Sequence, residues 1–382
     1  MFFFKGVLCT MSTAEQILQE VLEAFDFGGP VLTTQRYGGG HVNDTFLIHT
    51  SAPADTQGHY ILQRLSPVAF KHPDEVMANV MGVSEYLGNQ IQQQGGDRSR
   101  ESMAFMRPRC GQPYYTDSEG GAWRAYPFID DIDCFDTAET PAVFAASGRA
   151  FGRFQRMLSD YPAETLYETI PNFHNTEDRL AKLKAAIAAD PLGRVKNCQS
   201  EIDFVLRREA DCSVVVNAQR SGILPLRVTH NDTKLNNVLM DPITGEGLCI
   251  IDLDTVMPGL SVNDFGDSIR FGANHCAEDE RDLSKMYLDL EMFAAYTEGF
   301  LEGAAGSLTD AGIEYMPWGA RIITLECGMR FLTDYLEGDT YFHTQREGQN
   351  LDRCRTQFKL VADMEAHWNE MNEIVNRYRT KE

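Results

Sequence analysis

One segment of the chain reads Arg227-Val228-Thr229-His230-Asn231-Asp232-Thr233-Lys234-Leu235-Asn236-Asn237-Val238-Leu239-Met240, then Asp241-Pro242-Ile243-Thr244-Gly245-Glu246-Gly247, then Leu248-Cys249-Ile250-Ile251-Asp252. Its two apolar runs flank a turn rich in Pro and Gly, and this pattern predicts a β-hairpin. In an antiparallel hairpin the start of the first strand lies beside the end of the second. The sequence therefore predicts that Asn237 and Asp252 converge on one point.

The residues that converge there suit phosphoryl transfer. An amide oxygen from Asn237 and a carboxylate from Asp252 are ligands that Mg²⁺ accepts while it keeps positions for phosphate oxygens and water. Asp232 lies in the loop that precedes the hairpin, where a carboxylate can orient a hydroxyl or accept its proton. The alternative is that these residues only form turns, as isolated Asp and Asn residues often do. The order base, amide, carboxylate and the hairpin register favour catalysis.

The pattern H-x-D-x-x-x-x-N from His230 to Asn237, followed by Ile251-Asp252-Leu253-Asp254, resembles the catalytic loop and metal aspartate of the aminoglycoside phosphotransferase and choline kinase group, relatives of protein kinases. The longer wording through Gly259, Asp264-Phe265-Gly266-Asp267 and the segment 330–336 resembles N-acetylhexosamine 1-kinases, over most of the chain. The resemblance implies an α+β, bilobal, protein-kinase-like fold. It also implies ATP- and Mg²⁺-dependent phosphorylation of the anomeric C1 hydroxyl of a small-molecule sugar, GlcNAc or GalNAc.

The resemblance also implies roles for individual residues. Catalysis is expected of Asp232 and His230, and metal binding of Asn237, Asp252 and Asp254, although Asp254 could instead touch the acceptor. The expected nucleotide contacts are Gly38, Gly39, Gly40, His41, Asn43, Thr45, Arg64, Tyr126 and Phe128. Gln63 is the alternative to Arg64 at the position where related kinases place a phosphate-pairing lysine. The expected sugar contacts are Asp232, Arg330 and Tyr341, with an ion pair from Arg330 to Asp334 on one helix as the alternative.

Asp264-Phe265-Gly266 spells the metal motif of protein kinases but lies well beyond the hairpin. Asp264 and Asp267 are therefore expected to hold the loop behind the site rather than to bind the metal.

Strand patterns dominate the first third of the chain and helical periodicity the remainder. The predicted organisation is a small sheet lobe over 1–122, a hinge over 123–129 and a helical lobe over 130–382. Short strands are expected near 31–32, 45–48, 60–62, 103–106 and 123–128, and helices near 73–87, 177–189, 200–221, 281–304, 318–337 and 351–378. The glycines of 37–45 precede a strand, where they could let backbone amides approach phosphates; a plain turn is the alternative.

The bulk composition narrows the possible partners. The chain has 382 residues and a formal net charge of -22, which disfavours nucleic acid as a partner. Its nine cysteines are scattered without zinc-site spacing, and no stretch approaches the roughly 20 apolar residues of a membrane span. A cytoplasmic location is expected, and the oligomeric state stays open. Aminoglycosides, choline and homoserine-like alcohols are rival acceptors that the negative charge favours slightly, and a non-catalytic nucleotide-binding protein is a further alternative.

Overall fold

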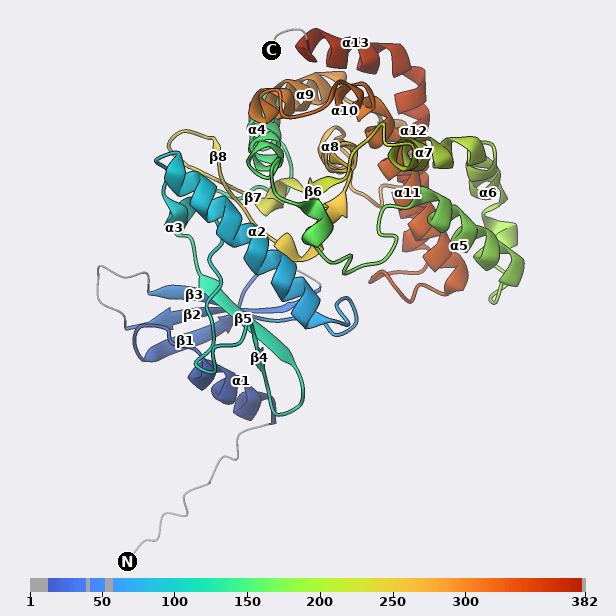
Figure 1. The fold of residues 1–382 in the computed structure, drawn as a ribbon. Helices are drawn as coiled ribbons and strands as arrows, with labels where there is room; N and C mark the ends of the chain where they lie inside the picture. Colours follow the sequence, from blue (N-terminus) through green and yellow to red (C-terminus); the bar gives the residue numbers. More distant parts are fainter. Residues whose placement is uncertain (1–12, 39–41, 52–57, 380–382) are drawn as a thin grey trace, which may run out of the picture. The chain divides into compact units, whose positions relative to one another are not determined.

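The computed structural model describes residues 13–38, 42–51 and 58–379. The chain divides into two compact units. The first contains the residues up to Gly88 together with Met103–Asp130, and the second contains Asn89–Ser102 together with the residues from Asp131 onward. The sheet of the first unit and the helices of the second are drawn in Figure 1. Within the described residues no helix is long and apolar enough to span a membrane.

The first unit is built on a five-stranded antiparallel sheet with the strand order β1-β2-β3-β5-β4. Its strands are β1 (Val31–Arg36), β2 (Asp44–Thr50), β3 (His59–Arg64), β4 (Tyr115–Thr116) and β5 (Ala122–Pro127), and its helices are α1 (Thr13–Ala24) and α2 (Pro73–Gln93), which continues into the second unit. The strand expected over 103–106 is only an isolated bridge from Met106 to Ala125.

The two faces of this sheet carry different side chains. Phe46, Leu62 and Ala125 lie on the face that packs against α1. Because neighbours across paired strands share a face and successive residues alternate, Gln63 and Arg124 lie on the opposite face. The alternation therefore decides which polar side chains can act together.

The second unit contains short strands and most of the helices. Its strands are β6 (Arg227–Thr229), β7 (Val238–Met240), β8 (Gly247–Ile250) and β9 (Met257–Gly259). Its helices are α3 (Arg98–Glu101), α4 (Pro141–Met157), α5 (Thr176–Ala189), α6 (Gln199–Leu206), α7 (Val214–Arg220), α8 (Ser261–Gly272), α9 (Leu290–Ala304), α10 (Asp310–Glu314), α11 (Met316–Glu337), α12 (Gln349–Ala366) and α13 (Trp368–Arg379). The helices expected over 200–221 and 351–378 are each divided, the first by a 3₁₀ segment and the second at His367.

Capping residues fix where several of these helices begin. Thr140 accepts a hydrogen bond from the Val143 amide, and Pro141 occupies the first turn of α4. Asn175 caps α5 and Asp289 caps α9 in the same manner. These caps satisfy amides that the first turn of a helix leaves without intrahelical partners.

Helices α4 and α9 approach each other through glycines. Added β-carbons at Gly148 and Gly152 of α4 would overlap backbone atoms of α9, and those at Gly299 and Gly303 would overlap backbone atoms of α4. Phe144 of α4 packs beside Tyr296 of α9 with ring centroids 4.6 Å apart. This close pair forms one wall of the largest apolar core of the second unit, to which α8 contributes Phe265 and Ile269.

Candidate active site

Two antiparallel strand pairs bring two loops together in the second unit. Loop 230–237 runs from β6 to β7, and loop 251–256 runs from β8 to β9. Because β7 pairs with β8 and β6 pairs with β9, both ends of one loop lie beside both ends of the other. The predicted hairpin is confirmed, with Val238 opposite Ile250, whereas the pairing of β6 with β9 extends beyond what was expected.

Hydrogen bonds also join the two loops directly. The Ile251 amide donates to the Asn237 carbonyl at 2.9 Å, which places Asp252 next to the start of the hairpin. The Thr255 hydroxyl donates to the His230 carbonyl at 2.6 Å, and the Asn231 side-chain amide donates to the Thr255 carbonyl at 2.8 Å. The loops therefore form one rigid platform.

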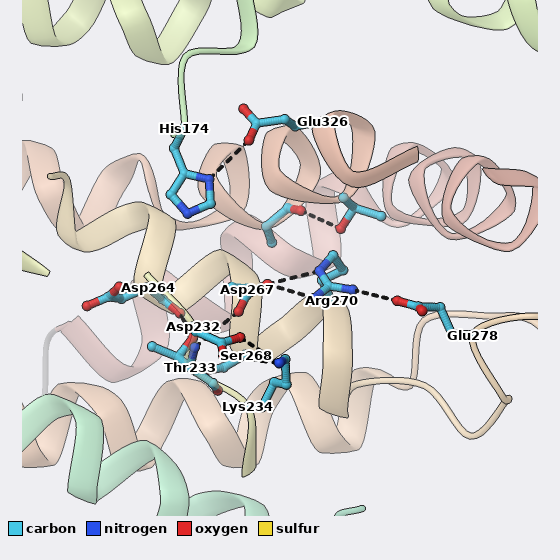
Figure 2. Close-up of polar contacts among 12 residues, drawn as sticks. His174, Asp232, Thr233, Lys234, Asp264, Asp267, Ser268, Arg270, Glu278 and Glu326 are labelled. Atoms are coloured by element: carbon cyan, nitrogen blue, oxygen red, sulfur yellow. Dashed lines mark hydrogen bonds and ion pairs between the residues drawn. The ribbon is translucent and has the colours of Figure 1, made fainter. Parts of the chain in front are cut away.

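Two buried carboxylates of α8 hold this platform from behind. Asp264 accepts hydrogen bonds from the backbone amides of His230 at 2.9 Å and Asn231 at 2.8 Å. Asp267 accepts one from the Thr233 amide at 3.1 Å and pairs with Arg270 at 2.8 Å (Figure 2). Burial alone would raise the pKa of Asp267, but the Arg270 guanidinium holds it below its ordinary value. The expectation that Asp264 and Asp267 hold the loop is confirmed by these contacts.

Asp232 forms an ion pair that the sequence reading overlooks. The Lys234 ammonium lies 2.9 Å from one carboxylate oxygen of Asp232 and 3.0 Å from the other. Their side chains are 35% and 25% exposed, so both are reachable from solvent. Burial lowers the pKa of Lys234, yet the Asp232 carboxylate outweighs this effect and raises it overall. The sequence feature that could have indicated this ion pair is the lysine two residues after Asp232 in the same loop.

The candidate metal ligands differ in their exposure. The Asn237 side-chain nitrogen donates to the Asp232 carbonyl at 2.8 Å, which leaves its amide oxygen as the group that could bind a cation. Asp252 ends the hairpin in the left-handed conformation, with φ 60°, and its side chain is exposed. Asp254, in contrast, is buried, with 4% of its surface exposed.

Asn237 and Asp252 offer two oxygen donors for Mg²⁺. Within residues 13–38, 42–51 and 58–379, no group of three or more His, Cys, Asp or Glu side chains could hold a metal ion. One amide oxygen and one carboxylate still fit Mg²⁺, because this ion usually binds one or two protein oxygens and completes its shell with water and phosphate. The donor set fits a metal that arrives with a nucleotide.

A catalytic role is expected of His230, and the structure shows how its imidazole is held. Its side chain is fully buried, and its Nε2 lies 2.9 Å from the Ile251 carbonyl oxygen. Its Nδ1 accepts a hydrogen bond from the Asp232 amide at 3.3 Å, and the rings of Phe151 and Phe154 contact the imidazole at their edges. Both ring nitrogens therefore have partners, and the imidazole joins the two loops.

The expected nucleotide contacts of the first unit fall into three groups. Gly38 precedes β2 with φ 76°, whereas Gly39, Gly40 and His41 lie outside the described residues. Asn43 accepts a hydrogen bond from the Ser66 amide at 3.0 Å. Tyr126 and Phe128 make ring contacts with Phe105 at 5.3 Å and Tyr37 at 5.5 Å.

Arg64 does not lie with the other polar residues of the sheet. It pairs across the strands with Trp123, on the face that α1 covers, and its guanidinium lies 5.9 Å from the Trp123 ring. The opposite face carries Gln63, which donates to the Thr45 hydroxyl at 3.1 Å and accepts from Arg124 at 2.8 and 3.0 Å. The alternation of the strand thus places Gln63 beside Thr45, and adds the buried Arg124 that the sequence reading missed.

Arg330 is surrounded by aromatic rings. Its guanidinium carbon lies 5.7 Å from the ring of Phe173, 6.0 Å from Tyr341 and 5.3 Å from Phe342. The alternative ion pair with Asp334 is wrong, because the Asp334 carboxylate instead accepts hydrogen bonds from the amides of residues 340–342 and from the Asn350 side chain. Asp334 thereby fixes the loop that carries Tyr341. No hydrogen-bond partner of Arg330 occurs in the part of the chain that the structure describes.

Comparisons with known proteins agree with this arrangement. Residues 33–298 match the family model described as "Phosphotransferase enzyme family". The fold is similar to that of an aminoglycoside phosphotransferase from Alicyclobacillus acidocaldarius subsp. acidocaldarius DSM 446, with a TM-score of 0.61 and 14% identity, over 97% of this chain and 99% of that one. The choline kinase from Cryptosporidium parvum Iowa II gives a TM-score of 0.58 and 11% identity, over 96% of this chain and 99% of that one.

A third solved structure, spectinomycin phosphotransferase in complex with ADP and spectinomycin, gives a TM-score of 0.53 and 15% identity, over 94% of this chain and 99% of that one. At these identities the likeness concerns the fold. The α+β, protein-kinase-like architecture expected from the sequence is thereby confirmed.

Proposed function

Because the chain belongs to the phosphotransferase enzyme family, we propose that it transfers the γ-phosphoryl group of ATP, in the presence of Mg²⁺, to the C1 hydroxyl of GlcNAc or GalNAc. The observation that carries the proposal is the Asp232 carboxylate, paired with Lys234 and placed next to Asn237. The use of ATP and a free sugar is consistent with a cytoplasmic location. The products are ADP and the sugar 1-phosphate.

Each group of this platform has a part in the proposed reaction. Asp232 orients the acceptor hydroxyl and accepts its proton as the oxygen attacks phosphorus. Lys234 lies beside the same carboxylate, so its positive charge can stabilise the negative charge of the phosphoryl group that reacts there. Asn237 and Asp252 would hold Mg²⁺, which shields the charge of the transferring phosphoryl group when it is bound. Asp264, Asp267 and His230 keep the loop in place.

The first unit supplies the proposed nucleotide contacts. Gly38 and Asn43 lie between β1 and β2, and Thr45 lies at the start of β2, where backbone amides can approach phosphates. Tyr126 and Phe128 lie at the end of β5 and beyond it, where a purine ring could pack against them. Gln63, held by Arg124, replaces Arg64 as the proposed polar contact to the phosphates.

Arg330 favours an uncharged acceptor over the cationic rivals. Among the described residues its guanidinium has no carboxylate partner, so it repels an aminoglycoside or a choline, whereas it can donate hydrogen bonds to the oxygens of an acetamido sugar. Tyr341 adds an exposed ring beside it. The local charge therefore weighs against the slight preference for cations that the net charge of -22 suggests.

The first test replaces Asp232 by Asn. We expect Asp232→Asn to reduce turnover of GlcNAc and GalNAc by at least ~1,000-fold, while binding of ATP measured by calorimetry stays close to that of the unchanged protein. Phosphorus NMR of the product identifies the phosphorylated hydroxyl. The control is Asp310→Asn, a carboxylate that is 85% exposed on α10. Near-normal turnover of the Asp232 variant would falsify the role of this residue, and ATP binding without turnover of any acceptor by the unchanged protein would identify a non-catalytic nucleotide-binding protein.

A further inference from the structure

The partly buried His174 and the buried Glu326 form a pair beside the platform. The His174 Nδ1 lies 3.0 Å from one carboxylate oxygen of Glu326, whose other oxygen accepts a hydrogen bond from the Thr176 hydroxyl at 2.9 Å. Glu326 is 1% exposed. Because a carboxylate only accepts hydrogen bonds, the proton of the neutral imidazole sits on Nδ1 and the lone pair on Nε2. Glu326 thus fixes both the orientation and the tautomer of His174.

The second ring nitrogen of His174 has no assigned role. Nε2 is buried, and it has no hydrogen-bond partner among the described residues. In Figure 2 this nitrogen points away from Glu326, toward the side on which Asp232 and Asp267 are drawn. A buried acceptor without a partner costs about 1–3 kcal/mol, so a donor that reaches Nε2 would be stabilised there.

A cavity of about 160 Å³ lies at His174. This volume is well above the roughly 10–15 Å³ that a cavity needs to hold one water molecule. Amide side chains and apolar side chains both line it. The polar members are Glu168, Asn172, His174, Asn175, Gln219, Asn231 and Asn263. Asn231 directly precedes Asp232, so the cavity reaches the catalytic loop.

The side chains that line the cavity carry little charge, and this indicates which class of ligand it could bind. Among the described residues that line the cavity there is no Lys or Arg, and the single carboxylate, Glu168, accepts a hydrogen bond from the Asn172 amide. Asn263 is 5% exposed, and no hydrogen bond of its side chain is found within the described ranges. Amides and an imidazole, next to the ring of Phe173, suit a ligand that has hydroxyl groups and no charge.

We propose that this cavity is a subsite for an uncharged, hydroxyl-bearing part of the acceptor, which donates a hydrogen bond to His174 Nε2. The inference rests on the proposed function in that the ligand is the phosphoryl acceptor. His174 contacts the acceptor, and Glu326 acts through His174 as a positioning residue. Arg330 does not line this cavity. Phe173 lies between the two, because it lines the cavity and its ring also faces the Arg330 guanidinium.

The test uses His174→Asn, because the side-chain nitrogen of Asn can take the place of Nδ1 and keep the contact to Glu326 while Nε2 is lost. We expect the KM for the sugar to rise about 10- to 100-fold, as for a lost hydrogen bond in a buried site, with kcat reduced less and the KM for ATP unchanged. Calorimetry with the sugar and ADP should show the same loss of affinity. Glu326→Gln should also raise the KM for the sugar, because an amide at this position no longer fixes the proton of His174 on Nδ1.

The control is His275→Asn, which removes a histidine from a surface pair with Asp289 at 2.6 Å and should leave all constants unchanged. Thermal unfolding checks that each variant is folded. An unchanged sugar KM and affinity in folded His174→Asn would overturn the subsite. The activity of the unchanged protein tests the proposed function separately. If the unchanged protein phosphorylates only cationic alcohols, the proposed acceptor is wrong. The effect of His174→Asn on the KM for those alcohols then still decides whether the subsite exists.

Discussion

Lys234 offers a test of the charge balance around the catalytic carboxylate. Lys234→Met removes the cation that lies 2.9 Å from Asp232 and keeps most of the apolar stem. We expect kcat to fall on the order of 100-fold, because a fixed charge beside the reacting groups is lost, while the KM for the sugar changes little. Steady-state kinetics at saturating ATP measure this.

Lys184→Met is the matched control, because Lys184 pairs with Glu209 on the surface at 2.5 Å with 43% of its side chain exposed. Such pairs contribute about 0–1 kcal/mol and should not affect turnover. Equal kcat values for the Lys234 variant and this control would exclude Lys234 from the chemistry.

Some of the site residues could be predicted from the sequence, and others could not. Asp232 and Asn237 follow from a motif, since their spacing along the chain carries the information. Gln63 and Arg64 are adjacent, and a shift of one residue moves a side chain to the other face of a sheet, so only the strand register decides between them. His230 is part of the same motif, yet its burial between Phe151 and Phe154 depends on α4, which is distant in sequence.

Glycine contacts between α4 and α9 give a prediction at the scale of elements. Gly152→Ala would place a β-carbon on the backbone carbonyl of Phe300, so the helices would have to separate. We expect the free energy of unfolding to fall by about 1–3 kcal/mol. In an open helix the same change would raise it by up to about 1 kcal/mol, so the sign of the change tests the contact. Urea unfolding followed by circular dichroism measures it, and a stabilised variant would contradict the close approach.

Elements were predictable where the pattern was long enough. The hairpin of β7 and β8 follows from two apolar runs and a turn, and α11 follows from a long helical periodicity. The pairing of β6 with β9 was not foreseen, because each strand has three residues and β9 contains Pro258 and Gly259. A side-chain contact within the candidate site also joins the two strands, because the Thr229 hydroxyl donates a hydrogen bond to the Met257 carbonyl at 3.1 Å.

At the scale of the whole molecule, the change from strands to helices along the sequence predicts an α+β protein. The expected hinge, 123–129, lies just before Asp130, where the first unit ends. The assignment of Asn89–Ser102 to the second unit was not foreseen, because it depends on contacts such as the Glu101 carboxylate with Arg153 at 2.8 Å. Long-range ion pairs of this kind leave no periodic signal in the sequence.

A network of ion pairs joins distant parts of the second unit. Glu365 of α12 accepts hydrogen bonds from Arg208 at 2.8 and 2.5 Å and from Arg321 at 3.0 and 2.7 Å. Arg321 also pairs with Asp211. Burial works to raise the pKa of Glu365, but Arg208 and Arg321 outweigh it and lower the pKa below the ordinary value of 4.5.

This shift makes the stability of the second unit depend on pH. A carboxyl whose pKa is lower in the folded state stabilises the protein above its ordinary pKa, and the contribution is lost as the pH falls through the lower, folded value. We therefore expect Glu365→Gln to lower the urea midpoint at pH 7 and at pH 5, and the gap from the unchanged protein to narrow below about pH 4.5. Glu314→Gln, an exposed position on α10, should show no such gap at any pH. A gap for Glu365→Gln that is constant from pH 7 to pH 3.5 would mean that the variant loses packing and shape rather than charge, because only the ionised carboxylate attracts the two guanidinium groups.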